Sequence, residues 1–516
     1  MKRADWLLLA ALALTSSAWC FTASRQLGAT FDEPFYFESG LDYWRRGHFG
    51  QLLSAGVMPL APHLQTLPIF IAEQTTGQTL SVENDLGEML RLARPVTLAF
   101  WVLLLASVMH LGRMAGGVWG GRLAAAIVAV EPNFLAHASL ATTDIALAAC
   151  FTAFVAQFLL GRTQGPLRRI VLPSMWFALA LAAKASALAL LPFAVGIAAL
   201  RDDRGHLRRL LLDVAAILVI GVTFAVAYCG TGGGTWLHGT LERMPATHAL
   251  RPLVAWLGSL PVFPNAFYAW WFQLAHNTTG QAVFVAGVAS ERALWFYVPV
   301  LLLIKPTVPL LLGSVIALAV TPAKRKAIVT AAIAVVAAMA IFRVQTGIRF
   351  FLPLLALAVA WVAAQLATVA RPLRMALILL PLWIAAESLA AWPDALRYVN
   401  QMWGGTTEGY RVVSDSNYDW GQGLPELSRW RARDGRPMAV WYFGTDTRFP
   451  ELIRYNPRQT SSEPAVLEGR LLAVSTSLLY GGYVESPGPA RTLIARLRSA
   501  TPIARTSTFL IFDTGY

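Results

Sequence analysis

The chain has 516 residues, of which 56% are hydrophobic and 14% are charged, and its formal net charge is +13. This apolar content excludes an ordinary soluble globular protein and indicates an integral membrane protein. The basic residues cluster in short loops between apolar runs, which is typical of membrane topology and argues against nucleic-acid binding. The three cysteines, Cys20, Cys150 and Cys229, lie in or beside apolar runs and have no metal-type spacing.

The first apolar run, residues 6–22, follows the basic start Met1-Lys2-Arg3. This pattern suits either a secretory signal peptide or an uncleaved transmembrane helix. The lack of a convincing small-x-small cleavage site before Arg25, and the many apolar runs that follow, favour a transmembrane helix.

Further apolar runs predict about eleven transmembrane helices in total. They lie near residues 6–22, 95–111, 118–131, 143–160, 170–183, 186–200, 210–229, 294–319, 327–342, 351–368 and 375–391. The 170–200 segment has two interpretations: two short helices joined around Lys184, or one long tilted helix.

Lys and Arg residues alternate from loop to loop, and the positive-inside rule makes the basic loops cytoplasmic. These loops hold Lys2 and Arg3; Arg113 and Arg122; Arg162, Arg168 and Arg169; Arg201, Arg204, Arg208 and Arg209; Lys324, Arg325 and Lys326; and Arg371 and Arg374. The N-terminus is therefore predicted in the cytoplasm. The loops 23–94 and 230–293 and the segment 392–516 are predicted on the outer side.

The segments predicted on the outer side contain patterns typical of helices and strands. Residues 35–44 and 60–71 are typical of helices lying along the membrane interface, and the Trp- and Phe-rich 230–293 loop favours the headgroup zone. Runs at 438–444, 471–479 and 509–512 predict strands. The predicted fold is a polytopic α-helical region, residues 1–391, followed by a small mixed α/β extracytoplasmic domain, residues 392–516.

The first candidate site is the acidic pair in Asp32-Glu33-Pro34, directly after the first span. Acids and proline suit the first turn of a helix, so the pair could be structural. Ionisable groups at a membrane boundary are nevertheless functional candidates. In that interpretation one carboxylate is a general base and its neighbour orients an acceptor or binds a cation.

The second candidate site is the turn from Pro132 through His137 to Thr143-Asp144. Thr143 and Asp144 could simply cap the next helix. The turn is predicted on the same membrane face as Asp32, however, and acids from two loops on one face suit a base combined with metal or acceptor binding.

The third candidate site is a set of cations near the same face: Lys184, Lys305, Arg343 and Arg349. A cation in an apolar span either extends to the interface or meets an anion. A lipid phosphate is a suitable partner because its negative charge grows as it leaves. The segment Asn417-Tyr418-Asp419-Trp420-Gly421-Gln422, taken alone, is an ordinary polar turn.

Several motifs together resemble the GT-C superfamily of polyprenyl-phosphate-sugar-dependent glycosyltransferases. The similar branch comprises bacterial relatives of protein O-mannosyltransferases and lipid A aminoarabinose transferases (glycosyltransferase family 39-like). The matching motifs, in family order, are Asp32-Glu33-Pro34 with Tyr36 and Gly40; Pro132, His137, Leu140 and Thr143-Asp144; Ile304-Lys305-Pro306; the run from Gly347 to Pro353; and the run from Asp415 to Gln422. Two departures are Gly423, where the family often has Asp, and the loose His-Pro-Pro likeness around Pro59, Pro62 and His63.

The resemblance implies an inverting glycosyltransferase of a bacterial inner membrane, with a polyprenyl-monophosphate sugar donor and a hydroxyl-bearing protein, lipid or glycan acceptor. It implies Asp32 as catalytic base, with Glu33 and Asp144 binding acceptor or a divalent cation (Mg, Mn or Zn). The remaining residues are assigned to substrate binding: Tyr36, His63, His137, and the phosphate contacts Lys184, Lys305 and Arg349.

Two other function classes remain open from the sequence. A lipid or solute transporter could use the same carboxylates for proton coupling, although transporters place ionisable groups near the midplane and often contain internal repeats. A non-catalytic assembly subunit is the other alternative. The motifs specify neither the sugar nor the acceptor.

Overall fold

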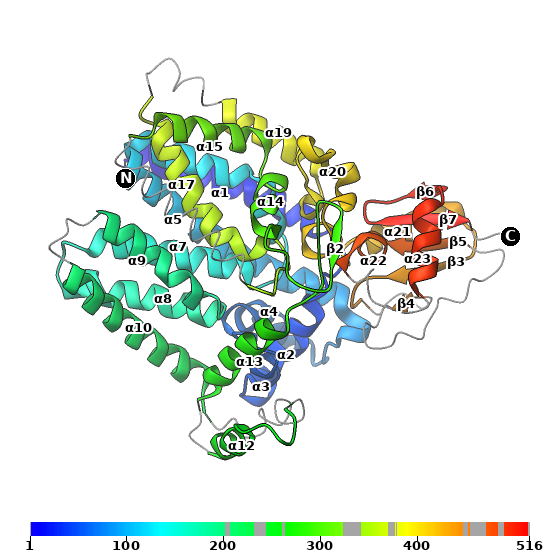
Figure 1. The fold of residues 1–516 in the computed structure, drawn as a ribbon, viewed down its shortest axis with the longest axis horizontal. Coiled ribbons are helices and arrows are strands. Elements are labelled where there is room, and N and C mark those ends of the chain that lie inside the picture. The colour runs from blue at the N-terminus through cyan, green and yellow to red at the C-terminus, as the bar shows by residue number, and fades with distance from the viewer. Residues whose placement is uncertain are drawn as a thin grey trace.

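The computed structural model describes residues 2–201, 207–231, 244–260, 264–322, 342–369, 377, 379–446, 452–454, 471–482 and 490–513. Helices make up most of the molecule, and a single five-stranded sheet lies at the end opposite the N-terminus (Figure 1).

Among the described residues, five helical segments are long and apolar enough to cross a membrane. They are Arg3–Ser24 (α1), Val82–Val130 (α5), Asp144–Gly161 (α7), Leu207–Cys229 (α10) and Ile348–Leu366, which joins the 3₁₀ turn Ile348–Phe351 (η4) to Leu352–Leu366 (α17). The chain is thus an integral membrane protein, but this number does not establish the predicted eleven spans. The span predicted near 327–342 lies outside the described residues, apart from Phe342. So do six of the predicted cytoplasmic basic residues: Arg204, Lys324, Arg325, Lys326, Arg371 and Arg374.

Helix α5 contains a reversal that accounts for two of the predicted spans. Its 49 residues are interrupted at Gly116 and Gly117, which have non-helical backbone angles. The two arms cross closely, because a Cβ on Gly112 would lie 2.6 Å from the carbonyl oxygen of Gly120. These arms contain the spans predicted at 95–111 and 118–131, but the first arm begins at Val82, inside the segment predicted as an outer loop.

Two of the predicted apolar segments are each divided into two helices. The 170–200 segment forms two short helices, Leu172–Ala183 (α8) and Ala187–Arg201 (α9), with Lys184 extended between them. The single span predicted near 294–319 is instead two helices, Tyr297–Ile304 (α14) and Val308–Val320 (α15), bent by 110°. Pro306 lies in this break and cannot continue a helix because it lacks an N–H donor.

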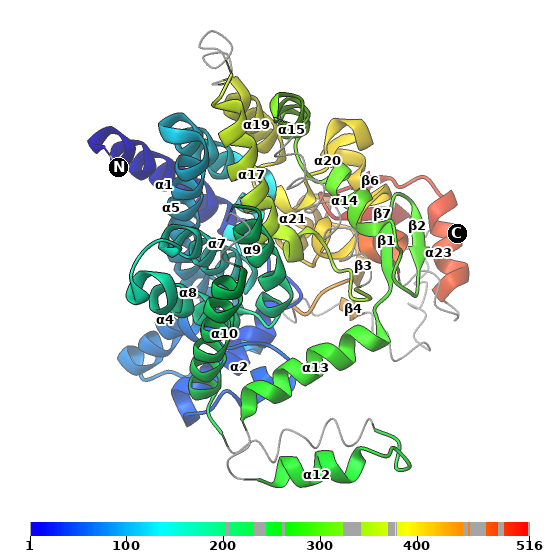
Figure 2. The same cartoon turned by 60° about the vertical axis from the view of Figure 1, so that its left-hand side comes forward.

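The remaining helices described in the first 391 residues are shorter. They are Glu33–Arg46 (α2), Gly50–Ser54 (α3), Leu60–Thr76 (α4), Pro132–Ala138 (α6), the π-helical turn Leu167–Val171 (η1), Arg251–Ser259 (α12), Asn265–Thr279 (α13) and Leu379–Ala391 (α19). Helices α2 and α4 contain the two segments predicted to lie along the interface. Figure 2 shows α13 running from the lower end of α10 towards the hairpin of Val283–Val285 (β1) and Val288–Ser290 (β2), with α12 apart from the body.

The C-terminal region begins with short turns and ends in the sheet. The turns are Ala395–Arg397 (η5), Gln401–Trp403 (η6), Gly405–Glu408 (α20), Gly409–Arg411 (η7) and Asp415–Asn417 (η8). The strands are Met438–Tyr442 (β3), Leu452–Arg454 (β4), Leu471–Ser475 (β5), Ala504–Arg505 (β6) and Phe509–Asp513 (β7). Leu424–Asp434 (α21), Thr476–Tyr480 (α22) and Ala490–Ser499 (α23) are the accompanying helices.

The sheet has the order β4-β3-β5-β7-β6, with β3 parallel to β4 and β5, and β7 antiparallel to β5 and β6. Strands occur in all three predicted regions. The predicted 471–479 strand ends at Ser475, where α22 begins.

The C-terminal region is joined to the loop that precedes Asp32. The Gly28 N–H donates to the carbonyl oxygen of Gln422, and the Phe31 N–H donates to that of Trp420, both at 2.8 Å. The Thr445 hydroxyl donates to the carbonyl oxygen of Phe31, also at 2.8 Å. The position of the loop is therefore fixed by residues nearly 400 positions away in the sequence.

Candidate active site

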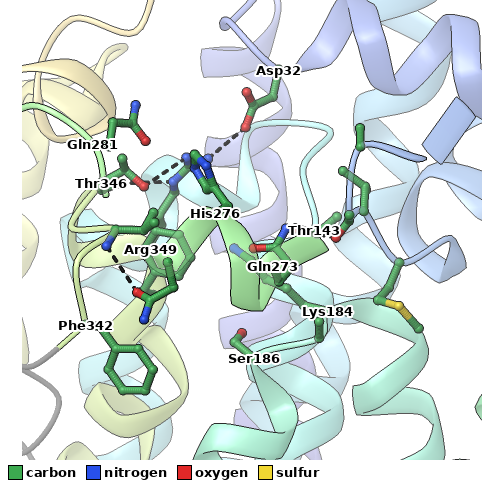
Figure 3. A pocket seen from close by; sticks show the side chains of 18 of the residues that line it. Asp32, Thr143, Lys184, Ser186, Gln273, His276, Gln281, Phe342, Thr346 and Arg349 are labelled. Atoms are coloured by element: carbon green, nitrogen blue, oxygen red, sulfur yellow. Dashed lines mark hydrogen bonds and ion pairs between the residues drawn. The ribbon is translucent and has the colours of Figure 1, made fainter. Parts of the chain in front are cut away.

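A cavity of about 620 Å³ lies where the helical region meets the C-terminal region. It is lined by residues from the start of α2, the α8–α9 junction, α13, the segment before α17, and the turns before the sheet. Charged side chains that line it are Asp32, Lys184, Arg349 and Asp415, and Figure 3 shows the first three around the same space. The structure thus brings one predicted acid and two predicted cations into one cavity.

Asp32 is the N-cap residue of α2 and faces the cavity. Its Oδ2 atom accepts hydrogen bonds from Arg349 Nη1 at 2.9 Å and from the Tyr36 hydroxyl at 3.2 Å. Its Oδ1 atom has no hydrogen-bond partner among the described residues, and 26% of the side chain is exposed. One carboxylate oxygen is therefore available to a bound molecule, while the other fixes the orientation of the group.

Arg349 is held by both backbone and aromatic contacts. Its Nε donates to the carbonyl oxygen of Thr346 at 3.1 Å, and its guanidinium carbon lies 4.4 Å from the centroid of the Trp420 ring. A guanidinium has five N–H donors. The bonds to Asp32 and to the carbonyl and hydroxyl oxygens of Thr346 use three, so two remain for an anion.

Lys184 is the second cation of the cavity, and it pairs with Asp144. Its Nζ donates to Asp144 Oδ1 at 2.5 Å and lies 4.3 Å from the centroid of the Phe350 ring. Asp144 itself is buried behind Lys184, and its Oδ2 accepts from the Thr142 hydroxyl at 3.2 Å. Asp144 therefore neutralises and orients Lys184 and does not line the cavity.

Glu33 points away from the cavity into the protein. Its carboxylate is fully buried and pairs with Arg94, with Nη2 to Oε2 at 2.7 Å and Nε to Oε1 at 2.8 Å. It also accepts from the backbone N–H groups of Thr30 and Ala141. Burial would raise the pKa of this carboxyl, but the Arg94 guanidinium holds it below its ordinary value.

The predicted metal donors do not fit a divalent cation in this arrangement. Both Glu33 oxygens bind Arg94, and Asp144 binds Lys184, so a cation would have to displace an ammonium or guanidinium group. In the described part of the chain, no group of three His, Cys, Asp or Glu residues could hold a metal ion. We therefore derive no catalytic step through a metal.

The two histidines predicted to bind substrate lie outside the cavity lining. His63 Nδ1 lies 2.6 Å from the Tyr228 hydroxyl, within a group of aromatic rings, and burial lowers the pKa of His63 to about 4. His137 is buried, with Nδ1 3.7 Å from Asp144 Oδ2 and its ring centroid 6.5 Å from that of Trp420. Burial likewise lowers the pKa of His137 to about 4.

Lys305, predicted as a phosphate contact, is buried in the break between α14 and α15. Its Nζ donates to the carbonyl oxygens of Leu396, Tyr398 and Asn417, at 2.9, 2.6 and 2.9 Å. All three ammonium protons are thereby used. In this structure Lys305 anchors the C-terminal turns to the helical region.

Several cavity residues were not predicted from the sequence. Gln273 and His276 come from α13, Thr346 from the segment before Arg349, and Asp415 from η8. The 415–422 run contains a signal that could have found Asp415, because it matches a family motif, but its polar residues suit an ordinary turn equally well. The α13 residues belong to no recognised motif.

No protein-family model matches the chain, and no curated protein sequence matches it. Among solved structures, ArnT from Cupriavidus metallidurans bound to undecaprenyl phosphate is 14% identical, with a TM-score of 0.52 over 99% of this chain and 98% of that one. The archaeal oligosaccharyltransferase AglB from Archaeoglobus fulgidus, in complex with an inhibitory peptide and a dolichol-phosphate, is 13% identical, with a TM-score of 0.49 over 93% of this chain and 71% of that one. The similarity to ArnT shows that this chain has the GT-C fold that its motifs predict.

Proposed function

We propose that the protein is an inverting glycosyltransferase that moves a sugar from a polyprenyl-monophosphate carrier to a hydroxyl-bearing acceptor at the outer face of the membrane. The observation that carries this proposal is the convergence of Asp32, Arg349 and Lys184 on one cavity, with a free carboxylate oxygen beside two cations. A base next to a phosphate-binding pair is what transfer from a lipid phosphate requires.

The walls of the cavity suit a lipid-borne donor. From the α8–α9 junction, Ala185, Leu188, Ala189 and Leu190 line the cavity together with one polar residue, Ser186, and Phe342 adds an aromatic ring to the lining. A polyprenyl tail would lie along this wall, while its phosphate would bind Lys184 and the two remaining N–H donors of Arg349. ArnT, whose fold this chain shares, was solved with undecaprenyl phosphate, and we expect a carrier of the same kind here.

The proposed reaction is a single displacement. Oδ1 of Asp32 takes the proton of the acceptor hydroxyl as its oxygen forms a bond to the anomeric carbon. The bond between that carbon and the phosphate oxygen breaks, and the electron pair stays on the polyprenyl phosphate. Arg349 and Lys184 stabilise the charge that develops there, and attack from the opposite face inverts the anomeric centre.

Substitution of the two cations tests the phosphate site. We expect Arg349→Ala and Lys184→Ala each to weaken binding of undecaprenyl phosphate by about tenfold or more, because each removes charge-assisted hydrogen bonds. Arg343→Ala is the matched control, since Arg343 is exposed, lies on the same segment and does not line the cavity. Titration of purified protein in nanodiscs measures these affinities. Equal affinities in all three variants would contradict the assignment.

The reaction class is tested by separating transfer from transport. Detergent-solubilised protein is incubated with sugar-linked undecaprenyl phosphate and membrane extracts that supply acceptors, and the released undecaprenyl phosphate is measured. We expect release to continue in detergent and with a proton uncoupler, conditions under which a proton-coupled transporter has no function. Mass spectrometry of glycans and glycoproteins from a deletion strain would identify the acceptor.

A further inference from the structure

Asp415 combines a cavity-facing carboxylate with an uncommon backbone conformation. It is one of two non-glycine residues with positive φ in the described part of the chain, at φ 55°. L-residues adopt this left-handed region rarely, although Asp and Asn tolerate it better than others. Such conformations persist only where the surroundings enforce them, and they cluster at functional sites.

The turn that contains Asp415 is fixed from two sides. The Asp415 N–H donates to Ser477 Oγ, at the start of α22, at 2.8 Å. The Ser416 hydroxyl donates to the carbonyl oxygen of Thr346, and Asn417 Oδ1 accepts from the Ile348 N–H at 2.9 Å. The turn is thus bound both to the sheet domain and to the residues directly before Arg349.

The carboxylate of Asp415 is only half satisfied by the protein. Its Oδ1 accepts from the Ser416 N–H at 2.6 Å, whereas Oδ2 has no hydrogen-bond partner in the residues that the structure describes. The side chain is half-buried and lines the cavity. Burial raises the pKa of Asp415 to about 6, and the nearby Arg349 opposes this rise. This oxygen is therefore available to accept a hydrogen bond from a molecule bound in the cavity.

The position of Asp415 relative to Asp32 and Arg349 indicates which bound molecule could donate a hydrogen bond to it. In a single displacement the sugar lies between the leaving phosphate and the attacking acceptor oxygen. In the proposed reaction the phosphate binds Arg349, and the acceptor hydroxyl binds Asp32. Asp415 lines the same cavity as both residues, and its turn is hydrogen-bonded to Thr346 and Ile348, close to Arg349 in the chain. Asp415 therefore faces the volume that the transferred sugar would occupy.

Building on the proposed function, we propose that Asp415 is a specificity-determining residue that accepts a hydrogen bond from a hydroxyl group of the transferred sugar and disfavours sugars that carry a carboxylate. A carboxylate accepts hydrogen bonds from hydroxyls strongly. It would repel an anionic sugar in a half-buried site that already contains Asp32. The substrate class is thus a sugar with a free hydroxyl at this position and without an acidic group.

The test compares three ligands: undecaprenyl phosphate, undecaprenyl phosphate glucose and undecaprenyl phosphate glucuronate. Binding is measured for the wild-type protein, Asp415→Asn and the control Glu38→Gln, which removes an exposed carboxylate that does not line the cavity. Asn tolerates the left-handed conformation. Glycine adopts the left-handed conformation without steric cost, so the Asp415→Gly protein is a second variant that should fold.

We expect the wild-type protein and Glu38→Gln to bind the glucose form better than the glucuronate form. Asp415→Asn and Asp415→Gly should weaken binding of the glucose form by about tenfold and reduce this preference, while affinity for undecaprenyl phosphate alone does not fall. The inference is overturned if the variants bind the glucose form normally, if they lose undecaprenyl phosphate to the same extent, or if the wild-type protein binds both sugar forms equally. A wild-type protein that fails to bind undecaprenyl phosphate would overturn the proposed function itself.

Discussion

Asp32→Asn is expected to lower the rate of sugar transfer by about 10²–10⁴-fold, the usual contribution of a general base. An amide has nearly the size of the carboxylate and can still accept the hydrogen bond from Arg349, but it cannot take the proton of an acceptor hydroxyl. Because Asp32 is partly exposed at the cavity, we expect the protein to remain folded. The measurement is the initial rate of undecaprenyl phosphate release, with the melting temperature recorded for each variant.

The control for this experiment is Glu38→Gln, which removes an exposed acid from the same helix. It should transfer sugar at the wild-type rate. The Asp32→Asn protein should still bind undecaprenyl phosphate, since Arg349 and Lys184 are retained. A near-normal rate in the Asp32 variant would refute its assignment as the base.

Glu33→Gln is expected to destabilise the folded protein by about 3–5 kcal/mol, the typical effect of removing one partner of a buried ion pair. The substitution leaves the Arg94 guanidinium buried without its counter-charge. Arg94 also donates to the carbonyl oxygens of Ser24, Leu27 and Gly28, so the loop before Asp32 should loosen as well.

Asp32→Asn is the matched comparison for this stability effect, because it makes the same chemical change one residue earlier. Thermal unfolding in detergent should show a large loss for Glu33→Gln and a small one for Asp32→Asn. A Glu33→Gln protein as stable as wild type, but inactive, would instead indicate a direct chemical role for Glu33.

The charge pattern of the sequence predicted which segments lie near the same membrane face. Asp32 and Arg349 lie 317 positions apart in the chain, yet both were predicted near the same face because the basic loops determine the orientation of each span. Their pairing in one cavity agrees with that prediction. The GT-C fold was predicted from motifs in family order, and the similarity to ArnT confirms it at the level of fold.

The different environments of Asp32 and Glu33 could not be predicted, because adjacent acids give the same sequence signal. The N-cap residue faces the cavity, whereas the first helical residue points towards Arg94. That partner comes from the first arm of α5, within a segment predicted to be part of an outer loop.

The surroundings of Lys305 are a second feature that could not be predicted from the sequence. Hydropathy predicted one continuous span that contains Lys305, because apolar composition does not indicate where a helix bends. The break at Pro306 turns the chain by 110° and places the lysine among backbone carbonyl groups instead of at the cavity. Its three acceptors belong to a distant part of the chain and could not be identified from local sequence.

The hydrogen bonds that join residues 28 and 31 to residues 422 and 420 have a practical consequence for engineering. A shortened chain that stops after α19 would lack the backbone partners of the loop before Asp32, so under the proposed function the helical part alone should not be active. Chimaeras that exchange the C-terminal sheet between proteins of this fold should be joined after residue 422, so that these two bonds stay with the host. Such a chimaera would keep these two backbone bonds, and it would need a hydroxyl at the position of Thr445 to keep the third bond to the loop before Asp32.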